Sequence, residues 1–281
     1  MKATENEQLK QLVMEKYSQI AEQNKSQNKS SCCGATCGCD TIDYAVMADD
    51  YSTLGGYVKD ADLGLGCGLP TEHALIKEGD TVVDLGSGAG NDAFVARAIV
   101  GESGRVIGID FTEKMIEKAR NNAAKLNYKN VQFRQGDIED MPLAENTADV
   151  VVSNCVLNLV PNKRKAFSET FRILKKGGHF SVSDIVLVGD LPEGLQKSAE
   201  MYAGCVSGAI QKSEYLNIIE EVGFTNIKIQ KEKRINLPDE ILKGYLTNEA
   251  IEEFRSGKSG IFSVTVYAEK STACCAPGCC N

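Results

Sequence analysis

The sequence predicts an α/β fold built on a mostly parallel sheet, and three observations support this prediction. From residue 81 onward, short runs rich in Val and Ile alternate with amphipathic stretches of helical length. A glycine-rich segment, GSGAG at 86–90, directly follows the first of these runs. Two further strand-like runs near the end of the chain suit an antiparallel finish to the same sheet.

Each element can be assigned from its local pattern. Strands are expected at 81–85, 105–110, 131–134, 149–154, 179–188, 226–235 and 261–270. Helices are expected at 7–21, 91–100, 112–127, about 161–174 and 213–222. The fourth of these helices is expected to end at the basic and glycine residues 175–178. Residues 189–212 are interpreted as an insertion of helix and loop, and 23–31 as a polar linker.

Composition narrows the classes of function. The 281 residues are 42% hydrophobic and 25% charged, which is ordinary for a globular chain. Its 31 basic and 39 acidic residues give a net charge of −8, so nucleic acid is not expected as a partner. The apolar runs are too short for a membrane span, and the first residues, MKATENEQLK, lack the apolar segment of a secretion signal. We therefore expect a cytoplasmic protein that has no membrane partner.

The glycine-rich segment predicts a ligand site at the end of the first strand. Asp84, Gly86, Gly88 and Gly90 form the pattern D-x-G-x-G-x-G between the strand and the following helix. Glycine at these positions lets the backbone pass close to a ligand. The spacing differs from the G-x-G-x-x-G of dinucleotide folds, and the segment has no Lys-Ser/Thr of a P-loop.

The next three strands end in side chains that suit a nucleoside. Asp110 ends the second strand, where a carboxylate can accept both hydroxyls of a ribose. Asp137 and Ile138 follow the third strand, where the Asp can meet an adenine amino group, and Asn154 ends the fourth. Ligands of open α/β sheets lie over the carboxyl ends of the strands, so these residues predict one shared site.

These segments together resemble the class I S-adenosylmethionine-dependent methyltransferases. VVDLGSGAG at 82–90 resembles the first motif of that group, VIGIDFT at 106–112 with Met115 the second, and GDIEDMPL and ILKKGGHFSVSD later ones. The resemblance, over about residues 78–188, implies a Rossmann-like, mostly parallel seven-stranded sheet flanked by helices, with a substrate-binding insertion. It also implies that S-adenosylmethionine is the co-substrate, held by Asp84, Gly86, Gly88, Gly90, Asp110, Met115, Asp137, Ile138 and Asn154.

The unusual feature of the composition is its eleven cysteines. Three of them stand alone in the body of the chain: Cys67 in GLGCGLP, Cys155 directly after Asn154, and Cys205 in AGCVSGA. The flanking glycines are expected to leave the Cys67 thiol unshielded. Three thiols from three segments could converge above the co-substrate, and three thiolates would bind a soft trivalent centre. Alternatively, each of the three is an inert core residue.

The three cysteine segments resemble the arsenite S-adenosylmethionine methyltransferases, which carry one reactive cysteine in each. GLGCGLP, SNCVLNLVPNK and AGCVSGA supply this likeness, which extends over about residues 9–270. It implies that Cys67, Cys155 and Cys205 bind As(III) and that a fourth, N-terminal cysteine pairs with Cys67. The candidates for the fourth are Cys32, Cys33, Cys37 and Cys39, of which we favour Cys33.

The implied reaction agrees with the chemistry of the residues. As(III) held by thiolates keeps a lone pair, so it can attack a methyl group without a general base. Transfer oxidises the arsenic, and Cys67 with Cys33 could return two electrons by forming a disulfide that an external dithiol resets. We therefore expect arsenite or its glutathione conjugates as substrate, a thioredoxin-like reductant and no essential metal.

The expected organisation has four parts: an N-terminal helix and Cys-rich linker at 1–40, the S-adenosylmethionine-binding core at 41–188, an arsenic-binding insertion with the last strands at 189–270, and a Cys-rich tail at 271–281. The end clusters, Cys32–Cys39 and Cys274–Cys280, could capture a soft metal, bind zinc or have no role in turnover. Two other functions remain open: methylation of another small molecule, and binding of metalloids by a thiol-rich protein with a degenerate core.

Overall fold

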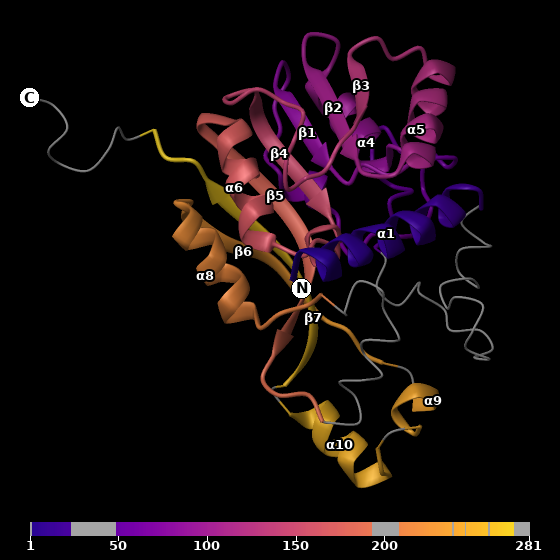
Figure 1. Cartoon of the computed structure of the whole chain (residues 1–281), viewed down its shortest axis with the longest axis vertical. Helices are drawn as coiled ribbons and strands as arrows, with labels where there is room; N and C mark the ends of the chain where they lie inside the picture. Colours follow the sequence, from indigo (N-terminus) through magenta and orange to yellow (C-terminus); the bar gives the residue numbers. More distant parts are fainter. Residues whose placement is uncertain are drawn as a thin grey trace, which may run out of the picture.

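The computed structural model describes residues 2–23, 49–192 and 208–272, apart from residues 238, 245 and 258. Its centre is a seven-stranded sheet in the order β3-β2-β1-β4-β5-β7-β6 (Figure 1). Five strands are parallel: β1 (Thr81–Leu85), β2 (Arg105–Asp110), β3 (Val131–Gln135), β4 (Ala148–Asn154) and β5 (Leu174–Val188). β7 (Gly260–Glu269) runs antiparallel to both of its neighbours, β5 and β6 (Thr225–Arg234). The predicted α/β class with an antiparallel finish is confirmed.

Helices cover both faces of the sheet. Alternating strand residues such as Val82 and Val83 belong to two separate hydrophobic cores, because successive side chains point to opposite faces. One core contains residues of α1 (Lys2–Ala21), α4 (Asn91–Val100) and α5 (Glu113–Lys125). The other contains residues of α6 (Lys163–Ile173) and α8 (Lys212–Val222). None of the described helices has both the length and the apolar character needed to cross a bilayer.

Two local expectations differ from the structure. β5 begins at Leu174 rather than near 179, because Leu174 pairs with Ala148 before the register shifts to His179 opposite Val150. The basic and glycine residues 175–178 therefore form an irregular part of this strand and do not end a helix, which stops at Ile173. Short elements without an expected counterpart are α3 (Pro70–His73), η2 (Leu157–Leu159), α9 (Asp239–Leu242) and α10 (Asn248–Ser256).

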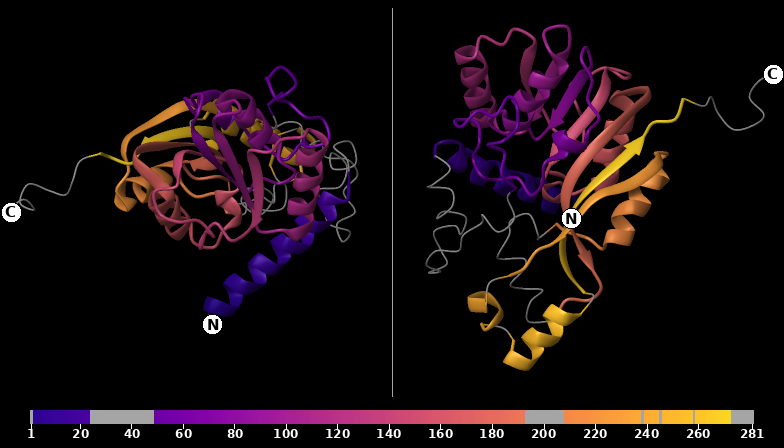
Figure 2. Two further views of the ribbon diagram at one scale, coloured as in Figure 1. Left: turned by 90° about the horizontal axis from the view of Figure 1, so that it is seen from above. Right: turned by 180° about the vertical axis from the view of Figure 1, so that it is seen from behind.

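α9 and α10 lie at the far end of the long strands β5 and β7, away from α4 and α5 (Figure 2). Thr247 caps α10, because its hydroxyl accepts a hydrogen bond from the backbone N–H of Ala250. The guanidinium of Arg234 donates to carbonyl oxygens at the other end of this helix, including those of Phe254 and Arg255. These bonds attach α10 to β6. The apolar side chains Ile251 and Phe254 of α10 pack in a third hydrophobic cluster, together with residues of β5 and β7.

Candidate active site

A pocket opens at the carboxyl ends of β1, β2 and β4, where the sequence places the ligand. The predicted cofactor residues that line it are Asp84, Gly86, Gly88, Asp110, Met115, Asp137, Ile138 and Asn154. Gly90 is not among the lining residues. A Cβ at Gly90 would lie within 3 Å of the rings of Phe94 and Phe133, so this glycine allows the start of α4 to pack on the sheet.

The glycine loop is shaped by two residues in the left-handed region, Gly86 at φ +64° and Gly88 at φ +50°. A Cβ on Gly86 would run into both methyl groups of Val156, whereas one on Gly88 would meet nothing within 4 Å. The backbone N–H of Gly88 donates to the carboxylate of Asp110 at 2.9 Å, and that of Thr112 donates to the other oxygen at 2.8 Å. Asp110 therefore holds the loop against the start of α5 while it lines the pocket.

The pocket is strongly acidic. Its described lining includes the six aspartates Asp49, Asp62, Asp84, Asp92, Asp110 and Asp137, against one lysine, Lys10. Burial raises the pKa of Asp84 well above its ordinary value, and the nearby carboxylates of Asp92 and Asp110 raise it further. Burial also raises the pKa of Asp92 to about 6, although hydrogen bonds from Tyr51, Asn154 and Thr71 oppose this shift. Such a site favours a cationic ligand.

Unsatisfied polar atoms show that the pocket fits a ligand. Within the described part of the chain, three buried atoms of lining residues have no hydrogen-bond partner: Asp84 Oδ2, Ser87 Oγ and Asn91 Oδ1. Buried polar groups are normally paired, so these atoms are available to a bound molecule. S-adenosylmethionine carries a sulfonium, an ammonium and hydroxyl groups, which match the acids, the orphaned oxygens and the open space over Gly88.

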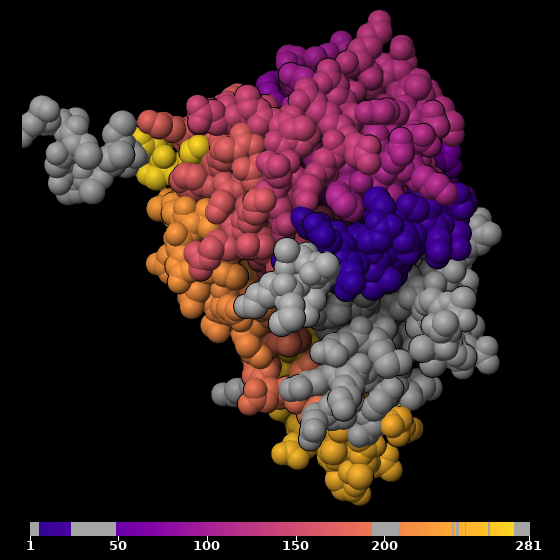
Figure 3. Space-filling model, viewed as in Figure 1, coloured from indigo at the N-terminus to yellow at the C-terminus, as the bar shows by residue number. Residues whose placement is uncertain are grey.

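Helix α1 supplies residues that sequence reasoning missed. Lys10 donates to Asp137 Oδ2 and to Glu139 Oε2, both at 2.5 Å, and Val13 and Tyr17 also line the pocket. Asp137, expected at an adenine amino group, thus has a cationic partner from the helix. Figure 3 shows α1 as an indigo band across the surface of the molecule. Its contacts join residues 127 positions apart, which no local pattern reveals.

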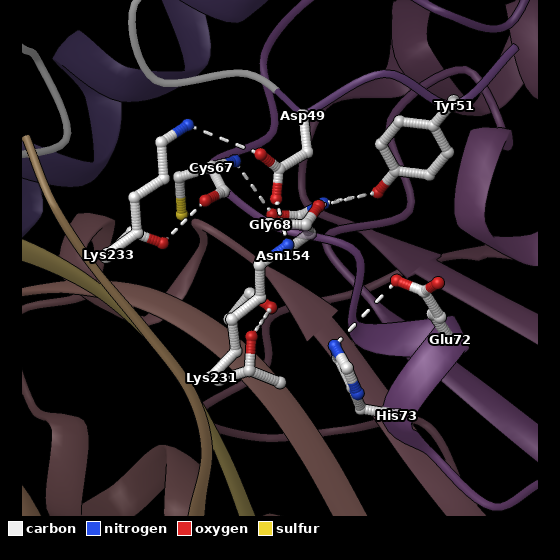
Figure 4. A network of polar contacts seen from close by, with 12 residues as sticks. Asp49, Tyr51, Cys67, Gly68, Glu72, His73, Asn154, Lys231 and Lys233 are labelled. Atoms are coloured by element: carbon white, nitrogen blue, oxygen red, sulfur yellow. Dashed lines mark hydrogen bonds and ion pairs between the residues drawn. The ribbon is translucent and has the colours of Figure 1, made fainter.

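Asn154 connects two of the predicted thiol segments. Its side-chain oxygen accepts a hydrogen bond from the backbone N–H of Cys67 at 3.0 Å, and its Nδ2 donates to the carbonyl of Gly68 at 2.8 Å (Figure 4). The next residue, Cys155, has a φ of +62° and lines the pocket. A left-handed non-glycine residue is uncommon and marks a constrained turn. The side chain of Asn154 therefore holds the Cys67 turn in place, and Cys155 is the next residue in the chain.

The expectation that the glycines leave Cys67 unshielded is wrong. The exposed fraction is 1% for Cys67 and 3% for Cys155. A Cβ on Gly66 would lie 2.6 Å from Asn154 Nδ2, and one on Gly68 would lie 2.5 Å from Ser183 Oγ. The two glycines allow the turn to pack closely, so they bury the thiol. Both cysteines join an apolar cluster with residues of β5, β7, α9 and α10.

A buried acid lies near this cluster and was not identified from the sequence. Asp184 is completely buried in β5, and burial raises its pKa to about 7 against the opposing charge of Lys163. The hydroxyl of Tyr215 donates to Asp184 Oδ2 at 3.0 Å. Burial, Asp184 and the nearby Cys67 and Cys155 raise the pKa of Tyr215. An aspartate within an otherwise uncharged strand segment was the available sequence signal.

The remaining predicted residues lie outside the described part of the chain. These are Cys205, the third predicted arsenic ligand, and Cys33, the predicted redox partner, together with both terminal cysteine clusters.

The chain matches the family model of a methyltransferase domain over residues 76–223. It is 40% identical over 236 residues to an arsenite methyltransferase of Halobacterium salinarum, which covers 79% of this chain and 59% of the relative. It is 36% identical to an arsenite methyltransferase of Aquipseudomonas alcaligenes, covering 63% of this chain and 53% of the relative. The chain thus spans little more than half the length of these curated relatives.

Among solved structures, an arsenic (III) S-adenosylmethionine methyltransferase from Chlamydomonas reinhardtii superposes with a TM-score of 0.62. The two chains are 33% identical, and the match covers 76% of this chain and 68% of the other. The fold, the acidic pocket and the family match define a class I S-adenosylmethionine-dependent methyltransferase. Within that class, the chain belongs to the arsenite S-adenosylmethionine methyltransferase family.

The acidic pocket predicts a pH-dependent affinity. Binding of S-adenosylmethionine is expected to weaken about tenfold from about pH 7.5 to about pH 5. The reason is that Asp92, whose pKa is about 6, becomes protonated and no longer attracts the cation. Calorimetric titration across this range measures the effect. Asp92→Asn should flatten the dependence, and S-adenosylhomocysteine, which lacks the sulfonium charge, should show less of it. An affinity for S-adenosylmethionine that does not change with pH would contradict the expectation.

Proposed function

We propose that this chain transfers a methyl group from S-adenosylmethionine to As(III) held by its own cysteine thiolates, giving methylated arsenicals. The position of Asn154 carries this proposal. Its side chain binds the Cys67 turn, and its peptide leads into Cys155, which lines the same pocket as Asp84 and the glycine loop. A soft metalloid acceptor matches thiolate ligands at that place.

In this proposal the chain's own residues act mainly by positioning. When bound, S-adenosylmethionine supplies an electrophilic methyl group and leaves as a neutral thioether. Cys67, Cys155 and Cys205 replace the three hydroxyls of arsenite, and each hydroxyl leaves as water with a thiol proton. The arsenic lone pair carries no proton, so Cys155 and its neighbours need only direct it at the methyl group. The apolar cluster around the two described thiols excludes water from the arsenic.

Methyl transfer raises arsenic from the trivalent to the pentavalent state, so another round requires two electrons. We propose that Cys67 and Cys33 supply them by forming a disulfide, and that a thioredoxin-like dithiol reduces this disulfide. Glutathione conjugates of arsenite are suitable substrates, because a thiol of the chain can displace each glutathione thiol. We also propose that the chain is organised in the four parts expected from the sequence, 1–40, 41–188, 189–270 and 271–281, and that it works in the reducing environment of the cytoplasm.

One assay tests the central claim. Purified protein is incubated with arsenite, S-adenosylmethionine and a dithiol, and the products are separated by arsenic speciation. Methylated arsenic should form, and it should be absent when S-adenosylhomocysteine replaces the methyl donor. A protein that binds S-adenosylmethionine in calorimetry but leaves arsenite unmethylated would refute arsenite as the acceptor.

A further inference from the structure

Tyr51 lies between the cofactor pocket and the Cys67 turn, and the proposed methyl transfer does not use its hydroxyl. Its ring is 4% exposed and packs with Leu69 and with Val95 of α4. Its hydroxyl lies 2.8 and 2.9 Å from the two carboxylate oxygens of Asp92. Both Tyr51 and Asp92 line the pocket, so the hydroxyl is bound to one of its acidic groups.

The same hydroxyl is connected to the thiol turn. Asn154 Nδ2 donates to the Tyr51 oxygen at 2.5 Å and to the carbonyl of Gly68 at 2.8 Å. The side-chain oxygen of Asn154 accepts from the N–H of Cys67. Figure 4 shows Tyr51 and the Cys67 turn meeting at Asn154. Hydrogen bonds therefore run from Asp92 through Tyr51 and Asn154 to the N–H of Cys67 and the carbonyl of Gly68. A longer direct bond, from Asn154 Nδ2 to Asp92 Oδ2 at 3.3 Å, runs beside this path.

The Tyr51 hydroxyl has one proton and two acceptors within reach. One is the Asp92 carboxylate, and the other is the carbonyl oxygen of Gly68 at 3.1 Å. A carboxylate with no counter-ion attracts the hydroxyl proton strongly. A cation bound in the pocket partly neutralises the Asp92 carboxylate and weakens this attraction. The Tyr51 hydroxyl can then donate to the carbonyl of Gly68 instead. Within the described structure, the carboxylates of Asp84 and Asp62 also repel the negative charge of Asp92. The same cation would reduce this repulsion.

We propose that Tyr51 is a positioning residue that, through Asn154, couples occupation of the cofactor pocket to the position of the Cys67 turn. This inference rests on the proposed function, in which Cys67 holds arsenic. Its consequence is an order of events. The methyl donor binds first, and its positive charge then sets the position of the Cys67 thiol, although the donor need not contact that thiol. Of the two described cysteines, Cys155 lines the pocket, whereas the pocket meets the Cys67 turn at Gly66.

The test follows the reactivity of Cys67 with iodoacetamide in the full-length protein. Labelling is quantified by mass spectrometry of the peptide that contains Cys67, with and without saturating S-adenosylmethionine. In the wild type, the methyl donor should change the labelling rate by about fivefold or more, the lower end of typical coupling between sites. Tyr51→Phe should reduce this change to less than about twofold, and should lower kcat more than it raises KM for the methyl donor.

Tyr57→Phe is the matched control. The Tyr57 hydroxyl donates to Asp62 Oδ2 at 3.1 Å, so the same substitution removes a bond to another pocket acid in the same segment. This control should keep the wild-type response of Cys67 to the methyl donor. If Tyr51→Phe does not fold by circular dichroism, Asn154→Ala breaks the same chain of bonds at its next member and should also abolish the response.

The outcomes separate this inference from the proposed function. A wild-type protein that methylates arsenite, but whose Cys67 labels at one rate with and without the methyl donor, overturns the inference alone. The same holds if folded Tyr51→Phe responds as the wild type does. Absence of arsenite methylation, with a Tyr51-dependent response of Cys67 retained, refutes the proposed acceptor and leaves the coupling supported.

Discussion

Cys155→Ser is expected to lower the rate of arsenite methylation at least about a hundredfold, because a displacement of the reacting atom by about 1 Å already costs that much. The serine hydroxyl is nearly isosteric with the thiol, but it is a hard donor that stays protonated at neutral pH and binds As(III) poorly. The substitution retains the left-handed turn at φ +62° and the backbone bond from residue 155 to the Ser183 carbonyl. The loss should therefore come from the missing ligand.

Three measurements check this expectation: arsenic speciation for turnover, calorimetry for S-adenosylmethionine, and thermal unfolding for the fold. Affinity for the methyl donor and the melting temperature should stay close to the wild-type values. Cys280→Ser, the same substitution in the terminal cluster, is the control and should retain turnover at saturating arsenite. Wild-type methylation by Cys155→Ser would refute the thiolate site and favour a carbon, nitrogen or oxygen acceptor in the same pocket.

Gly86→Ala is expected to weaken the binding of S-adenosylmethionine by about a hundredfold or more, equivalent to about 3 kcal/mol. The new Cβ would overlap both methyl groups of Val156, so the loop or Val156 must shift, and both line the pocket. The residue would also have to adopt φ +64°, which costs roughly 1–2 kcal/mol for a residue with a side chain. Calorimetric titration measures the affinity, and thermal unfolding measures the accompanying loss of stability.

Gly79→Ala separates the two effects. Gly79 also has a positive φ, at +86°, but its Cβ would approach only Ser103 Oγ, at 3.9 Å, and it lies outside the pocket lining. Its substitution should lower stability through the backbone alone and leave the affinity for the methyl donor unchanged. Equal affinities for Gly86→Ala and Gly79→Ala would show that close packing at the glycine loop is not needed for binding.

Local patterns in the sequence were sufficient for the framework of the site. The alternation of strands and helices, the turn at Gly86 and Gly88, and the acids at the strand ends Asp84 and Asp110 all depend on residues close together in the chain. Parallel strands then bring their carboxyl ends to one edge of the sheet, so these residues meet in one pocket without further information. The antiparallel finish could also be predicted, since β7 follows β6 and its sequence alternates apolar with polar residues from Phe262 to Val266, although the structure buries β7 at nearly every position.

The sequence by itself therefore determined the class of fold and the residues that meet in the pocket, and it predicts which cysteines would bind arsenic. Only the tertiary structure decided how these residues act on one another. The bond from Cys67 to Asn154 spans 87 positions and that from Lys10 to Asp137 spans 127, so neither leaves a periodic signal. The burial of Cys67 likewise depends on how closely Gly66 and Gly68 approach Asn154 and Ser183. A short-range pattern specifies backbone conformation, whereas side-chain contact and burial arise from packing between distant segments.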